Sequence, residues 1–361
     1  MRGWYIFLFL LSASVAADVQ QYRVEQPYEI SLRQPWALVA LPDDSFVVTE
    51  KHGALVWLQD DKKAIRQQVA LPDLYSEGQG GFLDIALTQD FALSNKVMLT
   101  YTRGTADNNQ LVIASAKLSN GQLSDITQIL AVTPTKDTPV HFGGRLAVLD
   151  DGTWLVSTGD GFDYREQAQK LTSQLGKILH FREDGSAVQA PPFSNAPFIY
   201  SLGHRNTQGL VTVNGKVIAH EHGPAGGDEI NVIKAGYNYG WPVVTLGDDY
   251  SGARISPFRE YPGMTPPLHN WTPSVAPSGM IHYTASRFTQ LTGQLLITTL
   301  KEKTLLSADI SKAPPQVTPV FTRISQRLRD VNVSSDGAIM LLTDGAKATV
   351  LSVVPSSSDS P

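Results

Sequence analysis

The stretch LAVLDDGTWLVS, residues 146–157, contains the pattern on which the fold depends. Apolar and small residues fill 146–149, the turn Asp150-Asp151-Gly152 follows, and a second apolar run covers 154–157. An Asp-Gly pair between two β-rich runs is a strong hairpin signal, because glycine accepts the positive φ that a tight turn requires. We therefore predict two antiparallel strands joined by this turn.

The same order of strand, turn and strand occurs six times along the chain. The repeats begin near residues 38, 83, 145, 210, 280 and 331. This spacing suits propeller blades of about four strands each. We predict an all-β, six-bladed β-propeller with functional loops at one mouth of the central channel. A sandwich of two sheets is the alternative, and the six repeats with long loops argue against it. Only residues 163–178 are expected to carry a short helix.

The composition excludes several classes of protein. The 361 residues are 42% hydrophobic and 17% charged, too apolar for a disordered chain. A formal net charge of −5 without basic runs argues against nucleic acid or an anionic membrane as a partner. The chain contains no cysteine, which excludes disulfides, thiolate metal sites and cysteine nucleophiles.

The two ends of the chain carry their own signals. Arg2, an apolar run over residues 4–11 and small residues over 14–17 are typical of a signal peptide. No later segment approaches the about 20 apolar residues that a membrane span needs. We expect a signal peptide over 1–17, a single β-propeller domain over 18–354 and a disordered tail over 355–361. The exported protein would be periplasmic or secreted.

Polar residues that no turn requires are concentrated beside the inner strands of the repeats. They are GQGG at 78–81, VHFGGR at 140–145, GHRNTQG at 203–209, EHGPAGGDE at 221–229, and LKEK at 300–303 with RLRD at 327–330. The loops at one mouth of a propeller supply its site. We therefore expect these residues to meet at one rim.

These strings, in this order, resemble the soluble quinoprotein glucose/sorbosone dehydrogenases, most closely the periplasmic aldose sugar dehydrogenases. The resemblance covers residues 35–353 and includes NYGWP at 238–242 and LTD at 342–344. It implies an enzyme that uses pyrroloquinoline quinone (PQQ) and Ca²⁺ to oxidise aldose sugars to lactones. An external electron acceptor, a quinone or a cytochrome, would reoxidise the cofactor.

His141 is the candidate general base. It precedes two glycines that let a ligand approach the backbone, and an imidazole titrates near working pH. The resemblance implies this role, whereas the residues alone also allow a histidine that only bonds a neighbouring loop. Asp160, in the string TGDG, would either orient the imidazole or serve only in a turn.

The resemblance also implies a set of residues that hold PQQ. They are Gln79, Arg205, Asn206, Gln208, Tyr250, Lys301, Arg327 and Arg329. PQQ is a flat tricarboxylate, so Lys301, Arg327 and Arg329 are expected at its carboxylates. Arg205 and Asn206 are expected at the quinone oxygens, where Arg205 has a catalytic role in stabilising charge. Taken singly, each cation could equally be a solvated charge at the rim.

Calcium is the expected metal, because it prefers carboxylate and carbonyl oxygen. The resemblance implies one ion at the backbone carbonyls of Gly223 and Pro224, and a second at Glu229 and the backbone of Tyr239. The His-x-His spacing at residues 220–222 also fits zinc or copper, but no third ligand has a convincing spacing.

Three functions remain compatible with the sequence. The first is the PQQ- and calcium-dependent oxidation of aldoses, and it is the one that we expect. The second is a calcium-dependent propeller hydrolase of the lactonase type, which would need several carboxylates at the channel. The third is a non-catalytic sugar-binding propeller, which gives no reason for the cations near His141. Val140 and Thr207 depart from the usual family pattern, so the substrate contacts transfer least.

Overall fold

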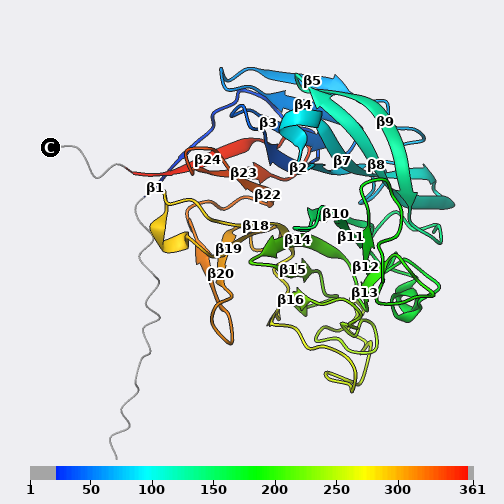
Figure 1. The fold of residues 1–361 in the computed structure, drawn as a ribbon. Helices are drawn as coiled ribbons and strands as arrows, with labels where there is room; N and C mark the ends of the chain where they lie inside the picture. The colour runs from blue at the N-terminus through cyan, green and yellow to red at the C-terminus, as the bar shows by residue number, and fades with distance from the viewer. Residues whose placement is uncertain (1–21, 357–361) are drawn as a thin grey trace, which may run out of the picture.

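The computed structural model describes residues 22–356. This part of the chain is mostly β-strand, arranged as six four-stranded antiparallel sheets. Figure 1 shows the sheets around a common centre, as the blades of a propeller, so the predicted all-β, six-bladed propeller is confirmed. The predicted signal peptide at 1–17 and tail residues 357–361 lie outside the described residues. The tail boundary predicted at 355 is wrong by one residue, because the last strand includes Pro355.

Each blade runs from an inner strand at the channel to an outer strand at the rim. The inner strands are β2 (Pro35–Ala40), β6 (Phe82–Leu87), β10 (Gly143–Val148), β14 (Thr207–Val213), β18 (Pro277–His282) and β22 (Leu328–Val333). The second strands are β3 (Phe46–Glu50), β7 (Lys96–Thr105), β11 (Trp154–Thr158), β15 (Lys216–Glu221), β19 (Leu295–Thr299) and β23 (Ile339–Thr343). The third strands are β4 (Ala54–Leu58), β8 (Asn108–Ser119), β12 (Lys177–Phe181), β16 (Asp228–Ile233), β20 (Leu305–Asp309) and β24 (Val350–Pro355). The outer strands are β5 (Ala64–Gln68), β9 (Gln122–Ala131), β13 (Ile199–Leu202), β17 (His269–Trp271), β21 (Gln316–Val320) and β1 (Tyr22–Glu25). Each predicted repeat therefore starts within or beside an inner strand.

Buried charges tie the inner strands of different blades together. The Asp84 carboxylate on β6 accepts a hydrogen bond from the Leu146 N–H on β10 (2.8 Å). In the same way Asp330 on β22 accepts the Leu38 N–H on β2 (2.9 Å). The Arg145 guanidinium lies 3.2 Å from Asp84 and 3.5 Å from Asp330. These bonds join the inner strands of consecutive blades and also of blades far apart in the sequence. They therefore fix the strands from which the loops of the site extend.

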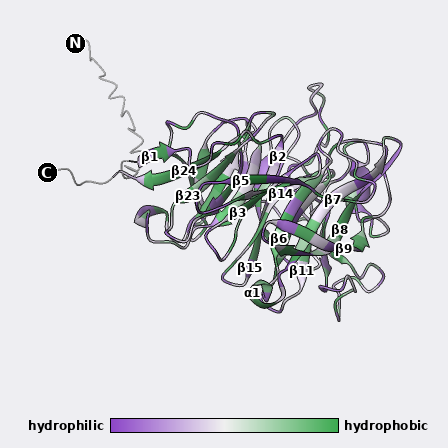
Figure 2. Ribbon diagram, turned by 90° about the horizontal axis from the view of Figure 1, so that it is seen from above, coloured by the Kyte–Doolittle hydropathy of each residue, from purple (hydrophilic) through white to green (hydrophobic). Residues whose placement is uncertain are grey.

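The ring closes through strands from opposite ends of the described chain. β1 pairs with β24, with Tyr22 opposite Pro355 and Glu25 opposite Ser352. β24 in turn pairs with β23, so the sixth blade takes its outer strand from the N-terminal side. Figures 1 and 2 both show β1 beside β24. The blade that closes the ring is therefore held by backbone hydrogen bonds as well as by side-chain packing.

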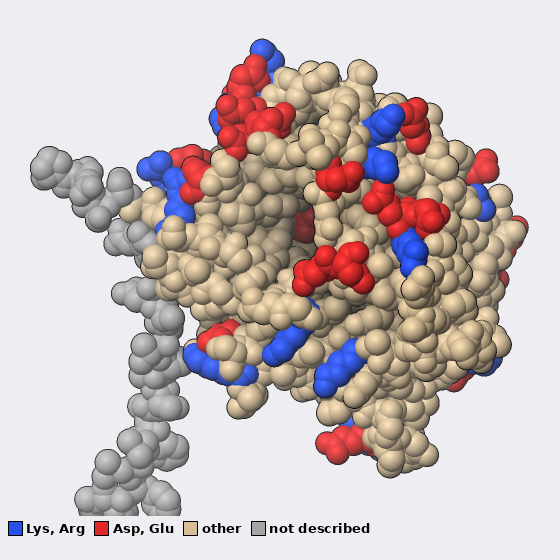
Figure 3. All heavy atoms as spheres, viewed as in Figure 1, with Lys and Arg blue, Asp and Glu red and all other residues tan. Residues whose placement is uncertain are grey.

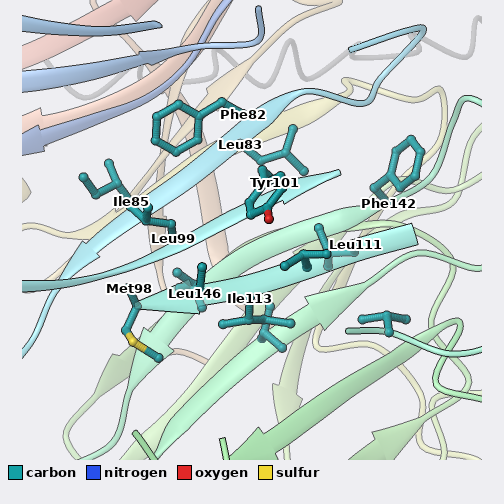
Figure 4. Packing of buried hydrophobic residues seen from close by; sticks show 14 of the residues in the cluster. Phe82, Leu83, Ile85, Met98, Leu99, Tyr101, Leu111, Ile113, Phe142 and Leu146 are labelled. Atoms are coloured by element: carbon teal, nitrogen blue, oxygen red, sulfur yellow. The ribbon is translucent and has the colours of Figure 1, made fainter. Parts of the chain in front are cut away.

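The core lies between the blades. In Figure 2 hydrophobic residues follow the strands, and much of the connecting chain is hydrophilic. The largest cluster includes Phe82 and Ile85 of β6, Leu146 of β10, and Phe142 in the segment just before β10 (Figure 4). Burial of such a side chain contributes about 1.5–3 kcal/mol. The residue that follows His141 in the chain is thus anchored in the core.

The helical segments are short: α1 (Phe91–Ser94), η1 (Arg165–Gln169) and η2 (Thr289–Leu291). The short helix predicted within 163–178 forms as the 3-10 segment η1, but this is not the only range with helix, since α1 and η2 lie outside it. The Lys177 ammonium group, on β12, donates hydrogen bonds to the carbonyls of Gln167, Ala168 and Leu175 and so holds η1 in place. Within residues 22–356, no helix has the length and apolar character required to cross a membrane.

The second blade is longer than the others. Its strands β7, β8 and β9 contain 10, 12 and 10 residues, and they form a wide curved sheet in Figure 1. At one end of this sheet Asn109 forms an isolated β-bridge with Lys136, in the segment that leads to β10. The long hairpin thereby supports the backbone that carries His141.

Candidate active site

Two cavities lie among the loops around the inner strands. One, which we call the His141 cavity, has a volume of about 150 Å³ and is lined among others by His141, Asp160, Phe162, Arg205 and Tyr250. The second, which we call the Gln79 cavity, has a volume of about 340 Å³. Gln79, Asn206, Gln208, Arg327 and Arg329 are among its lining residues. Figure 3 shows that the molecule is hollowed near its centre, with basic and acidic side chains interspersed around the hollow.

His141 is paired with a buried carboxylate. Its Nδ1 lies 2.7 Å from Asp160 Oδ1, and Asp160 is fully buried. The same carboxylate accepts hydrogen bonds from the Phe162 N–H (2.8 Å) and from Trp241 Nε1 (2.7 Å). Burial lowers the pKa of His141, while the hydrogen bond to Asp160 opposes this shift. The imidazole is therefore held neutral and in one orientation.

The backbone of His141 is constrained from several sides. Its φ is +54°, in the left-handed region that non-glycine residues seldom adopt. Its N–H donates to Gln79 Oε1 (2.8 Å), and a Cβ on Gly159 would lie 2.0 Å from its carbonyl oxygen. Residues with such dihedrals persist where the surroundings fix them, and they are concentrated at functional sites.

Arg205 connects the His141 cavity to the loop at 222–224. Its guanidinium donates to the Gly223 carbonyl (2.8 Å) and lies 3.5 Å from the Tyr250 hydroxyl. The buried Arg205 Nε has no hydrogen-bond partner in the described structure. Phe162 and Tyr250, both exposed, lie nearly parallel with ring centroids 6.5 Å apart. The cavity therefore combines a cation, a histidine and an aromatic wall.

The Gln79 cavity collects most of the cofactor residues predicted from the sequence. Arg327 and Arg329 form ion pairs with Asp344 at 2.9 and 2.8 Å. Asn206 Oδ1 accepts the Gly143 N–H (3.2 Å) and faces Gln208 Nε2 at the same distance. These amide and guanidinium groups surround one space, as predicted.

Three of the predicted cofactor residues lie elsewhere. Tyr250 and Arg205 line the His141 cavity and not the Gln79 cavity. Lys301 is exposed and lies next to Leu300, which does line the Gln79 cavity and whose carbonyl accepts a bond from Arg327. The positions follow from the loops: the chain passes between the two cavities at Arg205-Asn206, so adjacent residues face different spaces.

The structure adds residues that the sequence did not indicate. Lys51, Trp36 and Phe142 line the Gln79 cavity, and Phe162 and Trp241 line the His141 cavity. The Lys51 ammonium donates to the Gly78 carbonyl, and burial lowers its pKa. Lys51 follows directly on β3, where no repeated string drew attention to it. The signal that the sequence offered was the position of Lys51, directly after the second strand of the first blade.

A small third cavity contains three of the four predicted calcium residues. Gly223, Glu229 and Tyr239 line it together with Glu221. Burial and the neighbouring Glu221 raise the pKa of Glu229 to about 8. A Cβ on Gly223 would lie 2.2 Å from the Gly226 carbonyl oxygen, so the loop is closely folded. Pro224 lines the His141 cavity instead. Two neighbouring carboxylates, Glu221 buried and Glu229 half-buried, beside folded backbone are suited to a divalent cation.

The His-x-His spacing does not assemble a transition-metal site. His222 Nε2 bonds the Pro277 carbonyl (2.7 Å), and both ring nitrogens of the buried His220 have no hydrogen-bond partner within residues 22–356. Across residues 22–356 no group of three or more His, Asp or Glu side chains is arranged to hold a metal. The third ligand that the sequence lacked is not supplied by the fold.

Comparison with known proteins agrees with this geometry. Residues 32–352 match the model of one family, described as glucose/sorbosone dehydrogenase. The chain belongs to this family. It is therefore an oxidoreductase of the sugar dehydrogenase class, and the resemblance predicted from the sequence is confirmed.

Individual members of the family share most of their length with this chain. The aldose sugar dehydrogenase YliI of Escherichia coli (strain K12) is 33% identical over 96% of this chain and 97% of that protein. The crystal structure of the soluble aldose sugar dehydrogenase from Escherichia coli in its apo form has a TM-score of 0.87, with 32% identity, and covers 93% of this chain and all of that one. The PQQ-bound aldose sugar dehydrogenase of Streptomyces coelicolor has a TM-score of 0.74 at 25% identity and covers 93% of this chain and 98% of that one.

Proposed function

We propose that this member of the family oxidises aldose sugars to lactones with PQQ as cofactor and Ca²⁺ as metal. The observation that carries the proposal is the arrangement of His141. Its Nδ1 is bonded to a buried carboxylate, and it lines a cavity that also contains the Arg205 guanidinium. A neutral imidazole beside a cation in a cavity suits the removal of a proton from a hydroxyl group whose oxygen then gains negative charge.

The residues of the Gln79 cavity fit PQQ. A flat tricarboxylate needs several cations and amide donors around one space. This cavity has Arg327, Arg329 and Lys51 on its wall, with Gln79 and Asn206 among its amide residues. Arg205 precedes Asn206 in the chain, and its buried Nε is a donor that has no acceptor among residues 22–356. When bound, PQQ would supply a quinone that accepts the hydride from the sugar.

Calcium fits the cavity of Glu221, Glu229 and the folded Gly223 loop. Burial and the neighbouring Glu221 raise the pKa of Glu229, and a divalent cation held by the two carboxylates would offset their repulsion. We also propose that the carbonyls of Gly223 and Pro224, and the backbone of Tyr239, contribute oxygen ligands, as the family pattern implies. The ion would supply positive charge beside Arg205, which lines the same cavity.

The roles of the protein groups follow from their contacts. His141 Nε2, the ring nitrogen that Asp160 does not hold, would take the proton of the anomeric hydroxyl. Asp160 would keep the other proton on Nδ1 and stabilise the imidazolium that forms. Arg205 would stabilise the negative charge that develops on oxygen, and Phe162 and Tyr250 would limit access of water from the open side.

Reconstitution tests the function directly. Purified apoprotein would be mixed with PQQ and Ca²⁺, and dye reduction would be followed with a panel of aldoses, with EDTA and cofactor-free controls. Sugar-dependent turnover that requires both additions is the expected result. Absence of PQQ binding in calorimetry would overturn the proposal, and lactone hydrolysis without PQQ would establish the hydrolase alternative in its place. A quinone and a cytochrome would then be compared as electron acceptors.

We further propose that the protein acts after export, on the basis of the apolar run at residues 4–11 and the small residues that follow. Fractionation of cells that express the full chain tests this. The expected result is mature protein, shortened after residue 17, in the periplasm or the medium. Full-length protein confined to the cytoplasm would contradict it.

A further inference from the structure

Lys136 is a buried cation in direct contact with the segment that carries His141. It is only 4% exposed, and a lysine ammonium has three N–H donors. All three have acceptors: Asn109 Oδ1 (3.2 Å), the Val140 carbonyl (2.9 Å) and the Thr138 carbonyl. The ammonium also lies over the Phe142 ring, 3.5 Å from its centroid. Three of these contacts belong to residues 138–142.

We propose that Lys136 is a positioning residue for the oxidation of the sugar: its ammonium group holds the carbonyls of Thr138 and Val140 and so fixes the backbone of His141. This inference rests on the role of His141 in the proposed function. The carbonyl of Val140 belongs to the peptide whose N–H is that of His141. Lys136 therefore holds one side of this peptide, and Gln79 Oε1 accepts the N–H on the other side.

The contact explains how a strained residue is kept in place. His141 has a φ of +54°, a conformation that costs about 1–3 kcal/mol and persists only where neighbours impose it. Thr138, whose carbonyl Lys136 holds, donates its own hydroxyl to the Gly161 carbonyl (2.6 Å). Gly161 is next to Asp160, the partner of His141. Lys136 thus acts on both members of the His141–Asp160 pair.

Lys136 also connects this pair to the long second blade. Asn109 and Lys136 exchange two backbone hydrogen bonds of 2.8 and 2.9 Å, in addition to the side-chain contact. Asn109 is fully buried at the end of the β7–β8 hairpin. The additional length of this blade therefore has a purpose in the site, because it supplies the fixed support from which Lys136 reaches the His141 segment.

The charge of Lys136 acts on His141 as well. The charged groups that influence the His141 imidazole are Asp160, which raises its pKa, and Arg205 and Lys136, which lower it. Burial lowers the pKa of His222, and the charge of His141 in turn lowers it further. Burial lowers the pKa of Lys136 to about 7, against the opposing effect of Asp160 and Asp137. The ammonium of Lys136 and the guanidinium of Arg205 therefore both act against protonation of His141.

Lys177 provides a matched control. It is also a buried lysine, its ammonium also donates to three acceptors, the carbonyls of Gln167, Ala168 and Leu175, and burial lowers its pKa to about 7 as well. It is not among the groups that influence His141. Lys136→Met and Lys177→Met thus each remove a buried ammonium group that has three acceptors. Only Lys136→Met removes one that contacts the His141 segment.

The experiment compares the two variants with the wild type, reconstituted with PQQ and Ca²⁺. For Lys136→Met we expect kcat to fall about 10- to 100-fold, the effect of a small misplacement of a reacting group, with KM and PQQ affinity largely kept. Lys177→Met should lose thermal stability and keep its kcat. Equal losses of kcat in the two variants, or a wild-type kcat in Lys136→Met, would overturn the proposal.

A second readout does not depend on turnover. In histidine-labelled apoprotein, the imidazole of His141 is assigned by its absence in His141→Gln and titrated by NMR. Lys136→Met should raise the pKa of His141, because a positive charge is removed, while Lys177→Met should leave it unchanged. An unchanged pKa in Lys136→Met would count against the inference. Failure of the wild type to oxidise sugars would instead overturn the proposed function, and the titration would still report on the contact.

Lys136→Gln keeps the test decisive if Lys136→Met does not fold. Glutamine retains N–H donors for the carbonyls but carries no charge and is shorter. It should therefore lose less kcat than Lys136→Met, and it should raise the pKa of His141. A folded Lys136→Gln with wild-type kcat and wild-type pKa of His141 would overturn the proposal.

Discussion

Two histidine–carboxylate pairs in this propeller differ in the use of the second ring nitrogen. His141 bonds Asp160 through Nδ1 (2.7 Å), and no hydrogen bond to its Nε2 is found in residues 22–356. His204 bonds Glu221 through Nδ1 (3.0 Å) and Ser201 through Nε2 (2.8 Å), and it is fully buried against the Tyr239 ring. The first pair lines the His141 cavity, whereas His204 lines none of the three cavities and only its partner Glu221 reaches the small third one. A base requires one nitrogen that is held and one that is free, and of these two pairs the first meets this requirement.

The largest effect is expected at the reactive pair. His141→Gln should lower kcat by about 10²–10⁴-fold, the usual contribution of a general base, while PQQ still binds because His141 is not on the wall of the Gln79 cavity. Turnover and calorimetric PQQ affinity would be measured side by side. Loss of PQQ binding in a folded His141→Gln protein would make this histidine structural and would remove the distinction between the two pairs.

The carboxylate of the same pair should have the next largest effect. Asp160→Asn should lower kcat by about 10- to 100-fold, as is usual for partners that orient a reacting group. Its hydrogen bond raises the pKa of His141, so its loss should lower that pKa further. Since the base must be deprotonated, activity falls as pH drops through this pKa. The acid limb of the kcat/KM profile should thus move to lower pH, and a shift to higher pH would contradict the assignment.

Two of the predicted cofactor cations, Arg329 and Lys301, differ in how far their side chains are exposed. Arg329 lines the Gln79 cavity and its side chain is 17% exposed, so Arg329→Ala should weaken PQQ binding about 10- to 100-fold, as for a lost charge-assisted hydrogen bond. Lys301 is exposed, and Lys301→Ala should weaken binding at most about fivefold. Titration calorimetry with PQQ measures both. The reverse order would mean that the Lys301 side chain reaches the cofactor.

The smallest effect on activity is expected at the structural pair. His204→Ala removes two buried hydrogen bonds and the contact with the Tyr239 ring, so it should destabilise the protein by about 2–4 kcal/mol. With Ca²⁺ at saturation, the kcat of the folded protein should fall much less than in His141→Gln, although His204 also holds Glu221 of the proposed calcium cavity. Thermal denaturation and turnover at a temperature where the variant is folded would be compared. A loss of kcat as large as that of His141→Gln would show that both pairs take part in the reaction.

The strands could be predicted because their signals are local. Alternating apolar residues beside a turn with Asp, Asn or Gly form a signal that spans about ten residues. All six inner strands were predicted from such a pattern, and three of them are followed by Asp-Gly or Asn-Gly itself. Within 163–178 the expected short helix is the 3-10 segment η1, and Lys177 holds its carbonyls at Gln167 and Ala168, a contact that no local pattern reveals. Propensity is a weak guide where buried side chains replace the hydrogen bonds of a helix.

The site could be predicted only in part for the same reason. His141, Asp160 and Gln79 stand in strings that the family resemblance made visible, and the structure brings them together. Lys51 and Lys136 stand in ordinary sequence, and their importance arises from contacts with Gly78 and Val140. The separation of Arg205 and Asn206 into different cavities likewise depends on the path of the backbone.

The pairing of β1 with β24 has a consequence for the synthesis and folding of the chain. Residues 22–25 pair with residues 352–355, so this strand cannot pair until residues 352–355 have been synthesised. Closure of so long a loop carries a large entropic cost and comes late. Until then the sixth blade presents open strand edges that invite pairing with other chains. The ring that holds His141 therefore becomes complete in a single late event, and conditions that delay it favour aggregation over activity.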